Sequence, residues 1–178
     1  MLISEPQTLT PEHDVSQFDS GKPSLDAWLK IRAQRNQDLG FTAVVVVHDQ
    51  QRVVGFYGLS PTAISPHDLP RRIRTEQPPS PIPCFLLGQL AVDREYRNLG
   101  IGGGLVGHAF ARVVQSADLI GGRALIVQAI DDSAASYWRG WRFTPAPNDP
   151  FQLVRSLDDI RAAVAVADKA KGPRPPAT

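Results

Sequence analysis

A chain of 178 residues is long enough for one domain with a buried core, and 42% hydrophobic residues are typical of a globular rather than a disordered protein. The formal net charge of +1 does not indicate a polyanionic partner. No apolar run reaches the length of a membrane span, and residues Met1 to Pro11 lack the basic start and apolar stretch of a secretory signal. The one cysteine, Cys84, cannot form an internal disulfide, so we expect a reducing, cytoplasmic location.

The predicted elements follow from the spacing of apolar residues. Recurrence every three or four residues predicts helices, and short β-branched or apolar runs predict strands. In chain order these are a helix over 23–36, a hairpin of strands 43–47 and 53–59, a strand 84–92, a helix around 105–114, a strand 124–129, a helix through 137–138, a strand 151–154 and a helix over 157–167. The middle of the chain is a βαβ unit, so we expect an α/β fold whose mixed sheet carries helices on both faces.

Two segments are expected to lie outside these elements. Residues 61–83 form a Pro- and Arg-rich connection, and a connection that long in a compact domain is usually functional or mobile. We expect one domain over residues 1–167 and a disordered tail over 168–178.

A glycine-rich turn between a strand and a helix is the most informative feature, and it occupies residues 97–104. At such a turn the free N–H groups of the helix N-terminus face outward, where the helix dipole favours an anion. Gly100 and Gly102 allow the backbone to approach phosphate oxygens, and Arg97 can add a charged contact. The sequence therefore predicts a phosphate-binding loop.

Two other phosphate-binding motifs fit this loop less well. A Walker loop ends in Gly-Lys-Ser/Thr, whereas this loop ends in Gly103-Gly104-Leu105. A Rossmann fingerprint needs a third glycine where Leu105 stands and an acidic residue after the next strand. A turn that only connects strand to helix remains the alternative without a ligand.

Arg97, Gly100 and Gly102 match the Arg/Gln-x-x-Gly-x-Gly/Ala signature, and in these residues the chain resembles the GNAT acetyltransferases. The resemblance implies a GNAT-like fold with a mostly antiparallel central sheet and acetyl-CoA as the cofactor. It implies that strand backbone pairs with the pantetheine arm and that loop N–H groups hold the pyrophosphate. The residues expected to bind acetyl-CoA are Leu90, Ala91, Val92, Arg97, Asn98, Leu99, Gly100, Ile101, Gly102, Gly103, Ser133 and Trp138.

A narrower resemblance covers roughly residues 5 to 160. The segments 18–21, 25–29, 55–60 and 87–93 are similar to those of acetyltransferase toxins that are paired with ribbon–helix–helix antitoxins. This resemblance implies acetylation of the α-amine of aminoacyl-tRNA, which blocks translation. It also implies an antitoxin partner and a homodimer.

The strand over 84–92 contains no Glu or Asp, although many relatives of the family carry a general base there. An α-amine has an unperturbed pKa of roughly 8, against about 10.4 for lysine, so much of it is neutral near pH 7. Such an acceptor needs little help to lose a proton, whereas lysine needs a good base. The missing base therefore favours an aminoacyl ester over a protein lysine.

Three arginines in the long connection, Arg71, Arg72 and Arg74, are the predicted contacts to the tRNA backbone. Arginines that neutralise phosphates release counterions, so this contribution weakens with salt. The alternative is a solvated, flexible loop.

The helix that Asp131 to Ser133 are expected to cap departs from the family pattern. Relatives place a tyrosine five residues before the Phe of a Gly-Phe pair, where it protonates the leaving thiolate. Alignment on Phe143 puts Trp138 at the tyrosine position and Arg142 at the glycine position. Tyr137 lies one residue, or about 100° of helix, away.

Three interpretations of this helix stay open. Tyr137 is the catalytic acid after a change of register, which is the assignment we adopt. Alternatively, another group protonates the thiolate while Trp138 packs against the coenzyme, or the protein binds acetyl-CoA and catalyses poorly. Either aromatic residue can also simply belong to the core.

No metal site is predicted, because the four histidines show no ligand spacing: His13, His48, His67 and His108. The absence of a Gly-x-Ser-x-Gly motif speaks against a serine hydrolase. Two other functions remain open. One is a GNAT enzyme acting on a small-molecule amine or a protein N-terminus, and the other is a weakly catalytic acetyl-CoA-binding module.

Overall fold

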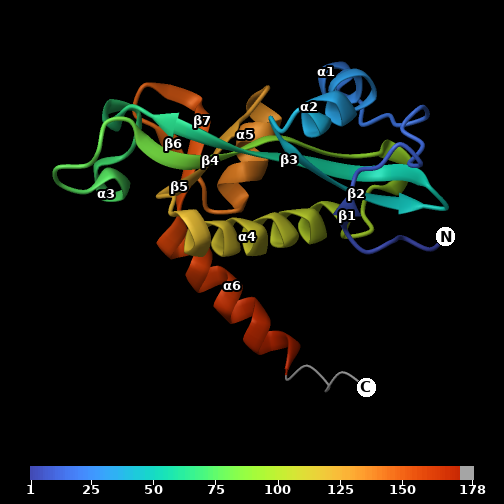
Figure 1. Ribbon diagram of the computed structural model, residues 1–178. Coiled ribbons are helices and arrows are strands. Elements are labelled where there is room, and N and C mark those ends of the chain that lie inside the picture. Colours follow the sequence, from blue (N-terminus) through green and yellow to red (C-terminus); the bar gives the residue numbers. More distant parts are fainter. Residues whose placement is uncertain (173–178) are drawn as a thin grey trace. The chain divides into compact units, whose positions relative to one another are not determined.

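The computed structural model describes residues 1–172. Its elements in chain order are β1 (Gln7–Thr8), α1 (Pro23–Ala27), η1 (Trp28–Ala33), α2 (Gln34–Asp38), β2 (Ala43–Asp49), β3 (Arg52–Ile64), η2 (Pro66–Asp68), α3 (Arg71–Arg74), β4 (Ile82–Val92), η3 (Arg94–Tyr96), α4 (Ile101–Ile120), β5 (Ala124–Gln128), α5 (Asp132–Gly140), β6 (Thr144–Ala146), β7 (Asp149–Ser156) and α6 (Leu157–Lys171). The strands form one mixed sheet in the order β1-β2-β3-β4-β5-β7-β6, which confirms the predicted fold class (Figure 1).

Two compact units share the chain. Unit 1 consists of residues 1–62 and 85–109, and unit 2 consists of residues 63–84 together with the chain from residue 110 onward. The elements β3, β4 and α4 therefore each contribute residues to both units. That residues 1–167 act as one acetyltransferase domain stays a prediction.

Strands β2 and β3 form the predicted hairpin of unit 1, with Val45 opposite Tyr57. The connecting residues Gln50 and Gln51 have positive φ values of 48° and 71°, which suit a two-residue turn between twisted strands. Apolar residues of the two strands then pack under the first helical stretch. The buried cluster comprises Leu9, Phe18, Leu29, Ala33, Val44, Val46, Val53, Phe56 and Ala91.

Helices cover both faces of β3 in unit 1, as predicted (Figure 1). A Cβ atom on Gly55 would lie 2.9 Å from Cγ2 of Ile101, so the start of α4 packs directly on that strand. Gly58 faces the opposite side, because strand residues three apart point away from each other. There a Cβ atom would lie 3.1 Å from the indole of Trp28, which stacks on Phe56 with ring centroids 5.9 Å apart.

Unit 2 is built on β7, which pairs antiparallel with β5 and with β6. Its core is aromatic. Trp138 of α5 packs edge-on against Phe143 at 5.2 Å between ring centroids, and Phe110 of α4 packs edge-on against Trp141 at 6.0 Å. These contacts fix α5 against the rest of the unit.

Several boundaries differ from the prediction. The expected irregular connection over 61–83 contains the end of β3, the short helical turn η2 and the helix α3. The last helix reaches Lys171, so residues 168–171 of the expected disordered tail are helical, and 173–178 lie outside the described residues. Strands β1 and β6 were not predicted. Within residues 1–172, no helix is both long and apolar enough to cross a bilayer.

Candidate active site

The glycine-rich loop leads from β4 into α4 through two left-handed residues. Asn98 has a φ of 62° and Gly100 a φ of 79°. Glycine adopts this conformation without steric cost, and asparagine tolerates it better than most residues. The turn therefore needs glycine at position 100 and redirects the chain so that the helix begins at Ile101.

The first turn of α4 presents unpaired backbone donors. The N–H of Gly104 donates to the carbonyl of Gly100 at 3.0 Å, which is the first bond of the helical ladder. By helix geometry, the N–H groups of Ile101, Gly102 and Gly103 lie before that ladder and have no partner within the helix. A Cβ atom on Gly100 or Gly104 would meet nothing within 4 Å. The loop therefore offers donors, a positive dipole end and open space, which fit a pyrophosphate.

A buried carboxylate anchors the start of the loop. Asp93 is 1% exposed and accepts hydrogen bonds from the backbone N–H groups of Asp19 at 3.1 Å and Glu95 at 2.9 Å. The guanidinium of Arg52 lies 3.4 Å away. Because these donors already occupy its oxygens, Asp93 positions the loop and is a poor candidate for a general base.

The arginines of the loop hold the segment over 19–21. Arg94 pairs with Asp19, and Nη2 of Arg97 donates to the carbonyl oxygen of Ser20 at 2.5 Å. Gly21, with a φ of 82°, allows this segment to turn beneath both side chains. The Phe-Asp-Ser-Gly motif thus has a structural role next to the loop. A contact of Arg97 with the pyrophosphate stays a prediction.

The end of β4 supplies the strand expected to pair with the pantetheine arm. Ala91 is buried, and Leu90 and Val92 are half-buried. Leu99, in the turn that follows, is 50% exposed. These residues are brought together with the glycine turn in unit 1.

Tyr137 and Trp138 point to different environments on α5. Trp138 is 7% exposed and belongs to the core of unit 2, whereas Tyr137 is 42% exposed. The two rings meet edge-on at 5.2 Å. The structure therefore assigns the core role to Trp138 and leaves the phenol of Tyr137 accessible. A contact between Trp138 and the coenzyme stays a prediction, as does catalysis by Tyr137.

The surroundings of Tyr137 keep its phenol protonated. Burial of part of the ring disfavours the phenolate and raises the pKa above its usual value, and an interaction with the Trp141 side chain offsets part of this rise. A phenol that holds its proton near neutral pH is suited to give that proton to a thiolate.

The cap of α5 is Asp131 rather than Ser133. The Asp131 carboxylate accepts from the N–H of Ala134 at 2.8 Å, which satisfies one of the free donors of the first turn. Ser133 lies inside the helix and is exposed. The expected capping role of Ser133 is therefore wrong, and its predicted contact with the coenzyme stays a prediction.

The three arginines of the connection lie on α3, in unit 2. Ile73 between them is 1% exposed, and its carbonyl accepts a hydrogen bond of 2.6 Å from Arg123. Arg72 lies 3.4 Å from Asp159. The helix is therefore anchored by packing and hydrogen bonds, unlike a flexible loop. Arg71 and Arg72 are exposed and Arg74 is half-buried.

Two further residues with reactive side chains have defined surroundings. His108 is half-buried, and its Nδ1 lies 2.7 Å from the hydroxyl of Tyr57. Cys84 is buried, and burial raises the pKa of its thiol to about 11, so it is not a nucleophile near neutral pH.

Comparison with known proteins shows which family this chain resembles in sequence and in fold. A model of the acetyltransferase (GNAT) family matches residues 8–139. A Mycobacterium tuberculosis protein named tRNA-acetylating toxin is 39% identical over 161 residues, which cover 90% of this chain and 96% of that protein.

Two solved structures share the fold at 23% sequence identity. A mutant of KacT has a TM-score of 0.84 and covers 92% of this chain and 99% of that one. AtaT complexed with acetyl-methionyl-tRNAfMet has a TM-score of 0.81 and covers 90% of this chain and 98% of that one.

Proposed function

The chain belongs to the GNAT acetyltransferase family, and from this premise we propose that it acetylates the α-amine of aminoacyl-tRNA and so acts as a translation-blocking toxin. The observation that carries the proposal is the identity of 39% to a tRNA-acetylating toxin over nearly the whole chain. Acetyl-CoA supplies the activated acetyl thioester. The chain's own residues bind it, orient the acceptor and move protons.

The loop at the start of α4 provides the binding function. Its free N–H groups are those of Ile101, Gly102 and Gly103. The hydrogen bonds that Asp93 accepts from the backbone N–H groups of Asp19 and Glu95 hold the loop in place. Donors that are held in place before the ligand arrives lose little entropy on binding. The loop therefore contributes affinity for the coenzyme.

The acceptor class follows from the bases that the chain offers. Strand β4 has no carboxylate, and the oxygens of the adjacent Asp93 are occupied by hydrogen bonds. An amine that is substantially neutral near pH 7 suits this environment, and an aminoacyl ester provides one. Tyr137 then holds the proton that the leaving thiolate takes up. Lysine, with a pKa of about 10.4, is a poor match.

We also expect the partners and the location of such a toxin. These are a cytoplasmic site of action, a ribbon–helix–helix antitoxin and a homodimer. The antitoxin has support from a relative, because a mutant of AtaT is solved bound to the C-terminus of the antitoxin AtaR. The homodimer and the location rest on the family resemblance.

Controlled expression in a bacterial host tests the biological part of the proposal. The wild type should arrest growth and stop incorporation of labelled amino acids into protein. The variant Gly100→Glu should relieve both effects, because a carboxylate at the loop repels the pyrophosphate. Arg161→Gln, a change on the exposed α6 pair with Asp118, serves as the matched control and should remain toxic.

Toxicity that persists in Gly100→Glu, at equal protein level, would separate growth arrest from acetyl-CoA and contradict the proposal. If the strain that expresses the wild type keeps growing, and its extract contains acetylated polyamines, the protein is instead an enzyme that acetylates small amines.

A further inference from the structure

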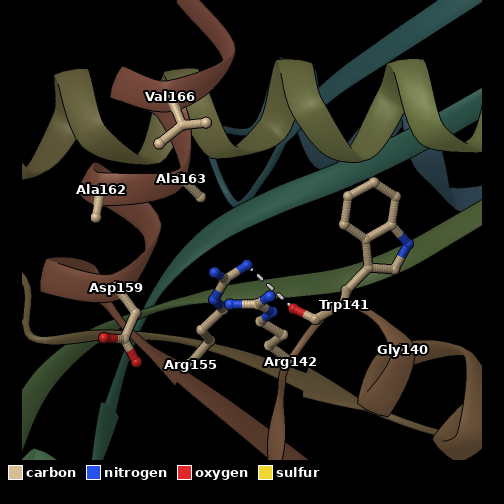
Figure 2. A pocket seen from close by; sticks show the side chains of 8 residues that line it. All are labelled: Gly140, Trp141, Arg142, Arg155, Asp159, Ala162, Ala163 and Val166. Atoms are coloured by element: carbon tan, nitrogen blue, oxygen red, sulfur yellow. Dashed lines mark hydrogen bonds between the residues drawn. The ribbon is translucent and has the colours of Figure 1, made fainter.

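A cavity of about 620 Å³ opens in unit 2 at the end of α5 (Figure 2). Its polar wall consists of Arg142, Arg155 and Asp159, and the carbonyl of Trp141 lies next to the guanidinium of Arg155. The first turns of α6 supply the other wall with Ala162, Ala163 and Val166. None of the sequence-predicted site residues lines this cavity.

Arg155 is a buried guanidinium that makes no ion pair among the described residues, although it lies over the ring of Phe110 at 5.4 Å to the centroid. The residue is 8% exposed, and its Nη1 donates to the carbonyl of Trp141 at 3.0 Å. Its Nε is buried and has no hydrogen-bond partner among the described residues. Among the described residues, a single hydrogen bond, from Nη1 to the carbonyl of Trp141, thus holds the side chain at the cavity wall.

Arg142 adopts a conformation that favours glycine. Its φ is 64°, its N–H donates to the carbonyl of Arg139, and the N–H of Phe143 donates to the carbonyl of Trp138. This bond pattern is a Schellman motif, in which glycine usually occupies the left-handed position. The family pattern also has glycine at this place. The arginine therefore brings a second guanidinium into the cavity at the expense of backbone strain.

The cavity has an excess of positive charge. Arg142 and Arg155 share it with one carboxylate, Asp159, which lies 3.4 Å from Arg72. Burial lowers the pKa of Arg155, the charge of Asp159 raises it, and the charge of Arg142 lowers it. Two guanidinium groups at one place attract an oxyanion, and phosphate matches their planar arrays of donors.

We propose that this cavity is a phosphate subsite for the RNA substrate, a proposal that rests on the acetylation of aminoacyl-tRNA. Asp159 lines the cavity and pairs with Arg72, so the arginine-bearing helix α3 contacts the cavity wall through this ion pair within unit 2. The half-buried Trp141, which packs edge-on against Phe110, also lines the cavity. The phosphates of an RNA chain can pair with the two guanidinium groups.

The cavity begins one helical turn after the residue proposed as the acid. Tyr137 lies on α5 four residues before Trp141, and Trp141 lines the cavity. A nucleotide held by the arginines would therefore lie near Tyr137. In this proposal the cavity binds the acceptor end of the RNA, and the glycine-rich loop of unit 1 binds acetyl-CoA.

The test uses a variant that should fold at least as well as the wild type. Arg142→Gly relaxes the left-handed backbone, so its melting temperature should equal or exceed that of the wild type. Its affinity for uncharged tRNA should fall about tenfold, and the slope of log K against log salt should decrease by about one. Arg161→Gln, the control, removes one positive charge from α6 outside the cavity. It should leave the tRNA affinity and the salt slope close to the wild-type values.

A second variant fills the subsite directly. Ala163→Glu places a carboxylate in the cavity wall, where it can pair with the arginines. Calorimetry with AMP as the probe, at saturating CoA so that the coenzyme site is occupied, should detect binding to the wild type. Neither Ala163→Glu nor Arg142→Gly should bind AMP.

Two outcomes overturn the inference. Unchanged tRNA affinity and AMP binding in both variants would mean that the cavity holds no phosphate. If the two variants keep the tRNA affinity of the wild type but lose binding to an acidic peptide that the wild type binds, the cavity belongs to a protein partner. If the wild type neither binds nor acetylates any tRNA, the proposed function itself fails, which is a distinguishable result because it needs no variant.

Discussion

At the scale of single residues, the two neighbouring aromatic side chains of α5, Tyr137 and Trp138, lie in different environments. The sequence alone left Tyr137 and Trp138 interchangeable, because one position of register separates a core role from an exposed one. Packing of Trp138 on Phe143 removes that ambiguity. The exposed phenol of Tyr137 is the only one of the pair with a proton to give to a thiolate.

The exchange Tyr137→Phe should therefore lower kcat at least a hundredfold, because a positioned acid contributes about 10²–10⁴ in rate. The KM for acetyl-CoA and the melting temperature should stay close to the wild-type values. Since burial raises the pKa of Tyr137 above its usual value, the phenol stays protonated through the neutral and mildly alkaline range. The wild-type kcat should hence not fall in that range through deprotonation of Tyr137. An active Tyr137→Phe protein would identify another proton donor.

Replacement of Trp138 by alanine should act on stability instead. Truncation of a buried tryptophan typically costs about 3–5 kcal/mol in the free energy of unfolding, because it removes apolar contacts and leaves a cavity. Urea unfolding of Trp138→Ala measures this loss, with Tyr137→Phe as the control that stays within about 0.5 kcal/mol of the wild type. Wild-type stability in Trp138→Ala would contradict the assigned core role.

At the scale of elements, the glycine-rich loop and the first turn of α4 together form the proposed binding site for the pyrophosphate of acetyl-CoA. Gly100→Glu should abolish binding of acetyl-CoA, by bulk and by repulsion of the pyrophosphate. Gly100→Ala is the matched control, because it has the same left-handed strain of about 1–2 kcal/mol without the charge. Calorimetric titration with acetyl-CoA compares the two. If both variants bind equally well, the loop is not the coenzyme site.

The close approach of α4 to β3 depends on a second glycine. In Gly55→Val the new side chain would collide with Ile101 and Leu105, whose atoms lie 2.9 Å and 3.0 Å from the Cβ position. Overpacking of this kind typically costs about 1–3 kcal/mol in unfolding free energy. Because the collision lies at the first turn of the helix, affinity for acetyl-CoA should fall as well. A variant with lower stability and unchanged affinity would show that the first turn stays in place.

At the scale of the whole molecule, the sequence predicted the long elements and missed the short ones. Runs such as 43–47 and 124–128 are long enough for their apolar pattern to identify strands. β1 and β6 have two and three residues, too few for any periodicity. The helix of Arg71 to Arg74 was also missed, because four residues among prolines give no helical pattern.

Only part of the candidate site was accessible from the sequence. The proposed coenzyme loop is continuous in the chain, so spacing alone was enough to predict it. The hydrogen bond between Asp93 and the backbone of Asp19 joins residues far apart in the sequence, and the cavity of Arg142 and Arg155 joins residues from different elements. One signal was present, since Arg142 stands where the family has glycine, but its partner in β7 could not be known without the fold.

The central claim is the transfer of an acetyl group to charged tRNA, and one measurement tests it most directly. Purified protein is incubated with radiolabelled acetyl-CoA and a full set of aminoacylated tRNAs, with free amino acids, polyamines and a peptide N-terminus in parallel, and with Gly100→Glu as the control. Label should appear on the α-amine of one or a few aminoacyl-tRNAs and nowhere with the control. Label only on small amines or peptides, or none at all while acetyl-CoA still binds, would contradict the account.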